Sequence, residues 1–153
     1  MSIITNSLLA KDIRLQLKAT DHRDALEEIL SSFRSDSRVR DWEKLRSALI
    51  ESSSNGSFKE NPCSMVLHHA RTEHVSGLVL AVGRSKEGFS IEGHQKKIHL
   101  LFVVAIPTAL NNEYLRILGA ISRVCRDPFT YGELLATTDP AGFLAILEKG
   151  CRQ

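Results

Sequence analysis

Apolar and polar residues follow two different periods along this chain, and these periods predict both strands and helices. Residues 13–17 alternate between apolar and polar side chains, which is typical of a half-buried β-strand. Three longer apolar runs, residues 63–67, 77–82 and 98–106, have few polar interruptions and predict buried strands. Pro107 follows the last run and should end it, because proline lacks the N–H that a strand ladder uses.

The other segments carry apolar residues at helical spacing. Asp21 precedes one such stripe and suits the N-cap of a helix, since its carboxylate can accept from an unpaired backbone N–H. A second helix is expected over residues 41–52, and a long amphipathic helix over residues 110–124. Two shorter helices are expected over 128–137 and 139–150, the last of which begins with an Asp-Pro pair suited to a cap and a first turn.

The order of these elements predicts an α/β fold. The strands are apolar enough to be covered on both faces, so we expect a mixed sheet of about five strands with helices on both faces. Residues 1–153 contain no internal repeat and no low-complexity tract, and their number suits a single domain.

Composition and charge exclude several classes of protein. The chain is 42% hydrophobic and 25% charged, as in an ordinary globular domain, and its net charge of +2 is spread over scattered basic residues. That distribution gives no basic patch for nucleic acid. No apolar run reaches the length of about 20 residues that spans a bilayer, and no signal peptide is evident, so we expect a cytoplasmic protein without membrane insertion. The three cysteines, Cys63, Cys125 and Cys151, are expected to be reduced thiols.

The densest chemistry lies in residues 68–72, which read His-His-Ala-Arg-Thr and follow an apolar run. Side chains alternate between faces along a strand, so His68 and His69 should point in opposite directions, one of them towards a cleft or solvent. A neutral imidazole is a nucleophile near neutral pH and can hold a transferred group. We therefore expect the function of the protein to depend on this pair.

The sequence around the pair resembles a known family. Residues 66–72, followed by Gly-Arg-Ser-Lys-Glu-Gly at 83–88, the strand at 98–107 and the helix start at 113–118, are similar to the enzyme IIA domains of the bacterial phosphoenolpyruvate-dependent sugar phosphotransferase system. The similarity is to the fructose/mannitol and nitrogen-regulatory type, and it includes the order of the elements. The resemblance implies the α/β fold and a phosphocarrier activity.

By this resemblance, His69 takes the place of the family's phosphorylated histidine. Arg71, Thr72, Lys59 and Tyr114 are candidates to stabilise the phosphoryl oxygens, because phosphoryl transfer requires positioning and donors around those oxygens. The family chemistry implies no bound cofactor. It implies a histidine-phosphorylated carrier protein as donor, and a sugar-transporter domain or a regulatory target as recipient.

This interpretation also predicts a geometry. His69 should lie at the rim of a shallow depression, with one ring nitrogen accessible and the other fixed by a hydrogen bond. Some of the candidate donors should converge on the accessible nitrogen, and His68 should be partly buried.

The sequence departs from the family pattern at three positions, and these departures support an alternative function. The family usually has proline where this chain has His68, an upstream arginine where it has Ser52 or Ser53, and a second histidine where it has Tyr114. A guanidinium suits phosphate oxygens and an imidazolium can carry positive charge, so both losses weigh against turnover. The alternative is a regulatory binding module with the same fold and no phosphotransfer. For His68, we keep both a structural role and a role as a second titrating group, and with it a place among the candidates that stabilise the phosphoryl group.

The remaining histidines give weaker signals. His74 could join the adjacent pair in a metal site, but a structural zinc site usually has four ligands. Only Cys63 and Glu73 are acidic or thiol residues at a suitable spacing, so we expect no metal site. His99 falls in a buried strand and should be a hydrogen-bonded core or edge residue. His22 and His94 are expected to be solvated.

Overall fold

The computed structural model describes residues 3–54, 64–91 and 95–151. In chain order, its elements are α1 (Ile3–Ser7), β1 (Leu8–Arg14), α2 (His22–Leu30), the 3₁₀ turn η1 (Ser31–Phe33), α3 (Trp42–Ser54), β2 (Met65–Arg71), β3 (Val79–Phe89), β4 (Ile98–Ile106), the 3₁₀ turn η2 (Thr108–Leu110), α4 (Asn111–Arg126), α5 (Pro128–Ala136) and α6 (Pro140–Cys151).

The described strands form one mixed sheet in the order β1-β3-β4-β2. The outer strands β1 and β2 run parallel to their neighbours β3 and β4, which pair with each other in antiparallel fashion. Strand β4 therefore lies inside the sheet, and its residues from Leu100 to Ile106 are fully buried. This agrees with its nearly continuous apolar sequence.

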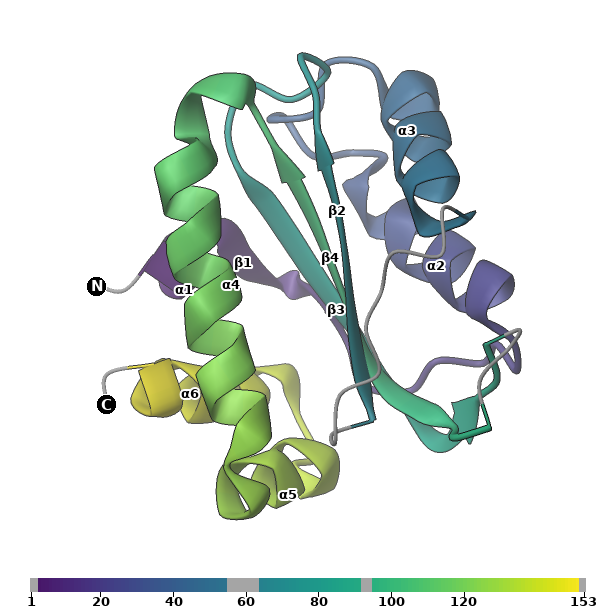
Figure 1. The fold of residues 1–153 in the computed structure, drawn as a ribbon, viewed down its shortest axis with the longest axis vertical. Coiled ribbons are helices and arrows are strands. Elements are labelled where there is room, and N and C mark those ends of the chain that lie inside the picture. The colour runs from purple at the N-terminus through teal and green to yellow at the C-terminus, as the bar shows by residue number, and fades with distance from the viewer. Residues whose placement is uncertain (1–2, 55–63, 92–94, 152–153) are drawn as a thin grey trace.

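Helices cover both faces of the sheet, as expected. Helices α4, α5 and α6 lie on one side, and α2 and α3 lie on the other (Figure 1). The alternation of side chains along β4 supplies both cores: Phe102 and Val104 pack on the side of α4 and α6, whereas Leu101 and Val103 pack on the side of α2 and α3. The α/β fold with a doubly covered mixed sheet is thus confirmed.

Helix starts follow local capping chemistry. The Asp21 carboxylate accepts from the Asp24 backbone N–H at 2.8 Å and caps α2, as the sequence predicts. The Asp139 carboxylate accepts from the Gly142 N–H at 2.6 Å beside the start of α6. Both caps satisfy a donor that the first helical turn leaves unpaired.

The strands differ from the sequence prediction in their limits. β1 lies at Leu8–Arg14 instead of 13–17, β2 continues to Arg71, and β3 continues from Val79 to Phe89 through a polar stretch. The described residues form four strands, against about five expected. The polar stretch 83–88 continues β3 beside β4, with an irregular register and a positive φ of 83° at Gly88.

The topology brings β2 and α4 together. β2 is an edge strand whose last residue, Arg71, lies opposite Ile106, the last residue of the parallel strand β4. Helix α4 begins at Asn111, soon after β4 ends. Side chains near the end of β2 and the start of α4 consequently meet at one edge of the sheet, close to the carboxyl ends of two parallel strands, where α/β folds commonly place their sites.

Candidate functional site

His69 is an exposed residue of the edge strand β2. Its partner in the ladder is Val104 of β4. The neighbouring residues His68 and Ala70 are buried, with exposed fractions of 4% and 8%, because their side chains point to the opposite face. The expectation that the two histidines diverge, with His68 buried, is confirmed.

A shallow, open hollow adjoins His69 at the sheet edge. Its volume is about 460 Å³, and α3 and β2 line it through Ala48, Glu51, Ser52, His69, Ala70 and Arg71. The Ser52 hydroxyl donates to the backbone carbonyl of His69 at 2.8 Å, which joins the end of α3 to the strand. The hollow is open to solvent beside His69.

Tyr114 of α4 is the ring neighbour of His69. The two ring centroids lie 5.0 Å apart at an interplanar angle of 34°, and the tyrosine is only 5% exposed. Burial raises the pKa of the Tyr114 phenol, and the nearby positive charge of Arg71 partly opposes that rise. The phenol therefore keeps its proton at neutral pH and can serve as a donor.

The environment of His69 favours its neutral form. Partial burial lowers the pKa of the imidazole, and the positive charge of Arg71 lowers that pKa further. A neutral ring has a lone pair on one nitrogen, so His69 is poised as a nucleophile at neutral pH. Within the described residues, neither ring nitrogen of His69 has a hydrogen-bond partner, so the tautomer-fixing bond that we expected is not found there.

The other candidate donors differ in position. Arg71 lines the hollow with His69. Thr72 does not: it is 9% exposed, its hydroxyl accepts from the His74 backbone N–H at 3.1 Å, and its own N–H donates to the Ile106 carbonyl at 2.9 Å. Through these two hydrogen bonds, Thr72 closes the turn after β2. Lys59 lies outside the described residues.

His68 contacts a residue that the sequence did not suggest. Its Nε2 lies 2.5 Å from Nε2 of His22, the first residue of α2, and the ring centroids are 4.7 Å apart. His22 is half-buried and its ring stacks on Phe89 at 6.2 Å between centroids. The expectation that His22 is solvated is therefore wrong. The pair joins residues 46 positions apart, and local sequence pattern carries no signal for such a contact.

Burial keeps both members of this pair uncharged at neutral pH. It lowers the pKa of His68 to about 3, with smaller contributions from the positive charges that His22 and His69 acquire on protonation. Burial also lowers the pKa of His22, against the opposing effect of the Asp21 carboxylate.

The remaining described histidines have structural surroundings. His99 Nδ1 lies 2.9 Å from the Ser85 carbonyl, as expected for a hydrogen-bonded histidine in or beside the core. The backbone of His74 closes the turn after β2 and accepts from the Arg40 N–H. In residues 3–54, 64–91 and 95–151, no three histidine, cysteine or acidic side chains are placed to hold a metal ion.

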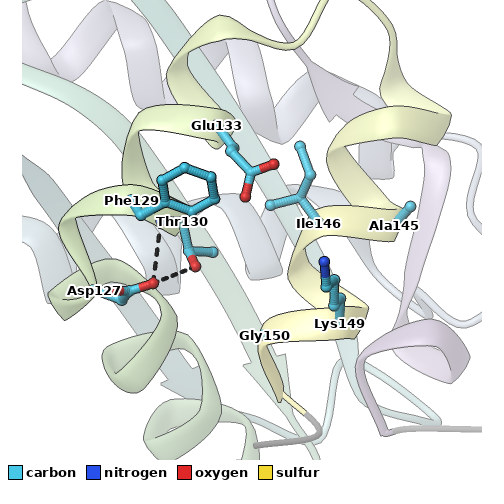
Figure 2. A pocket seen from close by; sticks show the side chains of 8 residues that line it. All are labelled: Asp127, Phe129, Thr130, Glu133, Ala145, Ile146, Lys149 and Gly150. Atoms are coloured by element: carbon cyan, nitrogen blue, oxygen red, sulfur yellow. Dashed lines mark hydrogen bonds between the residues drawn. The ribbon is translucent and has the colours of Figure 1, made fainter.

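A second hollow lies away from the candidate residues, between α5 and α6. Figure 2 shows Phe129 and Glu133 on one side of it and Ile146 and Lys149 on the other, with the Asp127 carboxylate bonded to Thr130. Its volume is about 300 Å³, and Phe129 is 76% exposed there. No residue that the sequence singled out lines it.

None of the helices in the described ranges combines the length and the apolar content needed to cross a bilayer.

Comparison with known proteins gives a consistent result. Residues 6–150 match the family described as "Phosphoenolpyruvate-dependent sugar phosphotransferase system, EIIA 2". The chain is 26% identical over 122 residues to the PTS system fructose-specific EIIABC component of Bacillus subtilis (strain 168), a match that covers 78% of this chain and 19% of that protein. It is 39% identical over 56 residues to the PTS system fructose-specific EIIA component of Haloferax volcanii, covering 36% of each. The matches thus span well under two thirds of either curated relative.

Solved structures share the fold. The nitrogen regulatory protein IIA-Ntr from Neisseria meningitidis has a TM-score of 0.83 at 19% identity, and the match covers 95% of this chain and 99% of that chain. The enzyme IIA of the Escherichia coli mannitol system, in its complex with phosphorylated enzyme IIB, has a TM-score of 0.77 at 17% identity and covers 94% and 98%. At such identities the likeness concerns the fold.

Proposed function

Since the chain belongs to the EIIA 2 family of the phosphoenolpyruvate-dependent sugar phosphotransferase system, we propose that it carries a phosphoryl group on a ring nitrogen of His69. The observation that supports this site is the exposed imidazole of His69 at an open hollow, beside Arg71 and the buried ring of Tyr114. The other strand histidine, His68, is buried and faces away.

The proposed step exchanges one phosphorus–nitrogen bond for another. The neutral ring of His69 attacks the phosphorus of a phosphohistidine on a carrier protein; the new bond to His69 forms as the bond to the donor imidazole breaks. The electron pair of the broken bond stays on the donor nitrogen. Such a transfer requires mainly alignment and charge stabilisation, for which Arg71 and the Tyr114 hydroxyl are the candidates in the described residues. It requires no cofactor.

The partners that we propose follow from this chemistry. The donor is a histidine-phosphorylated carrier protein, and the recipient is a sugar-transporter component or a regulatory target, in the cytoplasm. The openness of the hollow supports a macromolecular donor, because its histidine can reach the rim of an edge strand without a buried channel. The mannitol-system relative was solved in complex with phosphorylated enzyme IIB, which illustrates such a recipient for that protein.

The first prediction tests His69 directly. The purified chain is incubated with phosphoenolpyruvate, the general phosphotransfer enzyme and the carrier protein, and its intact mass is measured. Wild type should gain about 80 Da, labile in acid, as expected for one phosphoryl group. His69→Gln should gain nothing, whereas the control His74→Gln should label like wild type.

Two outcomes would contradict the proposal: an unchanged mass of the wild type with its cognate carrier, or equal labelling of His69→Gln. The unchanged mass would favour the alternative, a regulatory binding module without phosphotransfer. One observation favours that alternative. Ser52 occupies one of the two positions where the family resemblance places an arginine; it contacts the backbone of His69 but brings no positive charge. A module of this kind should bind a target that distinguishes wild type from His69→Asp in a pull-down.

A further inference from the structure

The contact between His22 and His68 lies directly behind the proposed phosphorylation site. His68 and His69 are consecutive residues of β2 whose side chains leave opposite faces of the strand. His22 begins α2, where its own backbone N–H donates to the Ser90 carbonyl at 3.0 Å and its ring stacks on Phe89. The pair is therefore held by α2, β2 and the end of β3.

The 2.5 Å separation of the two Nε2 atoms fixes how protons are distributed. One Nε2 must carry hydrogen and donate, while the other must present its lone pair, so the pair without charge shares one hydrogen at this contact. One more proton can enter on the remaining nitrogen of the donating ring. The resulting imidazolium still donates to a neutral imidazole, and a charged donor strengthens a short hydrogen bond. The pair can thus hold one positive charge without losing its contact.

Protonation or phosphorylation of His69 changes the free energy of protonating the His22–His68 pair. Burial opposes protonation of the pair, and a proton on His69 would oppose it too, whereas the Asp21 carboxylate favours it. A phosphoryl group on His69 brings close to two negative charges to the other side of the same strand. The electrostatic effect of His69 on the pair then reverses its sign and favours the charged form.

We propose that the His22–His68 pair takes up one proton when His69 is phosphorylated, and that the resulting positive charge stabilises the phosphohistidine. The proposal rests on the proposed function of His69. The proton comes from solvent and is returned when the phosphoryl group leaves, and no bond to phosphorus changes within the pair. Positive charge would in this way reach a site whose upstream arginine and second histidine are replaced by serine and Tyr114.

A carboxylate at position 69, which is negatively charged above about pH 4.3, tests the pair without any phosphotransfer. The apparent pKa of the coupled pair is measured by NMR of ¹⁵N-labelled imidazoles in His69→Glu and in the uncharged control His69→Gln. The apparent pKa should be higher in His69→Glu by about one pH unit, as expected for one charge at several ångströms in a partly buried setting. Equal pKa values in the two variants would overturn the proposal.

A second experiment removes the proton site and keeps the hydrogen bond. His22→Gln places a side-chain amide near the position of the ring nitrogen, and this amide can bond to His68 but does not titrate. At equilibrium with the phosphorylated carrier at about pH 5.5, where a raised pKa charges more of the pair, the ratio of phosphorylated to unphosphorylated protein should be about fivefold lower in His22→Gln than in wild type, and unchanged in the control His99→Gln. An unchanged ratio in His22→Gln would contradict the stabilising role. If wild type takes no phosphoryl group at all, the proposed function fails, while the comparison of the Glu and Gln variants still decides whether the pair responds to charge.

Discussion

At the scale of single residues, the burial of His68 makes the stability of the protein depend on pH. It is 4% exposed and its pKa is lowered to about 3, so the folded protein keeps this imidazole neutral at a pH at which the unfolded chain protonates it. The unfolded state then binds more protons, and stability falls as the pH falls below about 6.5, until the folded pKa is reached. The contribution is fully present above pH 6.5.

The corresponding prediction compares wild type with His68→Gln in urea denaturation at pH 7 and pH 5. Between these values, protonation of the unfolded histidine should lower the free energy of unfolding of the wild type by about 2 kcal/mol more than that of the variant. The variant keeps an amide that can bond to His22, so loss of the contact is limited. Equal pH dependence in the two proteins would show that His68 titrates in the folded state much as in the unfolded chain.

The sequence predicts some features of the site at this scale and misses others. The opposite orientation of His68 and His69 follows from strand alternation alone and is confirmed. The contact of His68 with His22 depends on how α2 packs on the sheet, and the position of Thr72 depends on a turn bond to His74. Local periodicity predicts neither the His68–His22 contact nor the position of Thr72, because it indicates which face of an element is buried and not which residues of other elements pack against that face.

At the scale of elements, α4 shows how far periodicity determines packing. The helical spacing of apolar residues in the sequence places both Leu115 and Ile121 on the buried face of this helix. The structure buries Ile121 completely, leaves Leu115 52% exposed, and buries Ile117, which the predicted face did not include. Several apolar residues follow one another around this helix, so more than one face fits the helical period. Contacts with the sheet and with α5 and α6 select the face that is buried.

This difference gives a matched pair of substitutions. Ile121→Ala removes fully buried atoms and leaves a cavity, so we expect a loss of about 2–5 kcal/mol in the free energy of unfolding. Leu115→Ala changes a largely exposed side chain on the same helix and should alter stability by about 0.5 kcal/mol or less. Chemical denaturation of both variants measures the contrast, and equally large losses for the two variants would show that Leu115 is buried as the sequence pattern predicts.

Strand limits are the least predictable elements of this chain. The sequence prediction ends β2 before the histidines and β3 before Gly83, because polar residues interrupt the apolar runs there. Both strands continue, since pairing with β4 satisfies their backbone groups whichever side chains they carry. The site residues of β2 therefore lie within a strand and are held in a fixed register opposite β4.

At the scale of the whole molecule, the α/β fold and the covering of both sheet faces are predictable, whereas the polar contacts between segments are not. Arg38 shows this. Its guanidinium bonds to Asp36 at 2.7 Å, donates to the Leu78 carbonyl at 3.1 Å, and lies 3.9 Å from the Asp12 carboxylate of β1. These partners come from three parts of the chain, and no local pattern groups them.

The last prediction concerns this ionic cluster. Asp12 is fully buried and Asp36 is 7% exposed, so both carboxylates depend on nearby positive charge. Bonding to Arg38 holds the pKa of Asp36 well below its usual range, which means that the folded state favours the charged carboxylate at neutral pH. Arg38→Met keeps the apolar stem and removes the charge, so Asp36 loses its main partner. Lys11 remains, 3.1 Å from the Asp12 carboxylate and 3.3 Å from that of Asp36.

We expect Arg38→Met to lower the free energy of unfolding by about 3 kcal/mol at pH 7, since Lys11 is nearly half exposed and compensates the charge of the two buried carboxylates only in part. The exposed residue Arg40 supplies the control, and Arg40→Met should change stability by about 0.5 kcal/mol or less. Denaturation at pH 7 measures both. The stability that the lowered pKa of Asp36 provides is complete only above the pKa of this carboxyl in the unfolded chain. The difference between Arg38→Met and wild type should therefore persist from pH 7 to pH 5 and shrink below about pH 4. A constant difference down to pH 3 would show that Arg38 stabilises the fold through its backbone contacts, and not through the carboxylates.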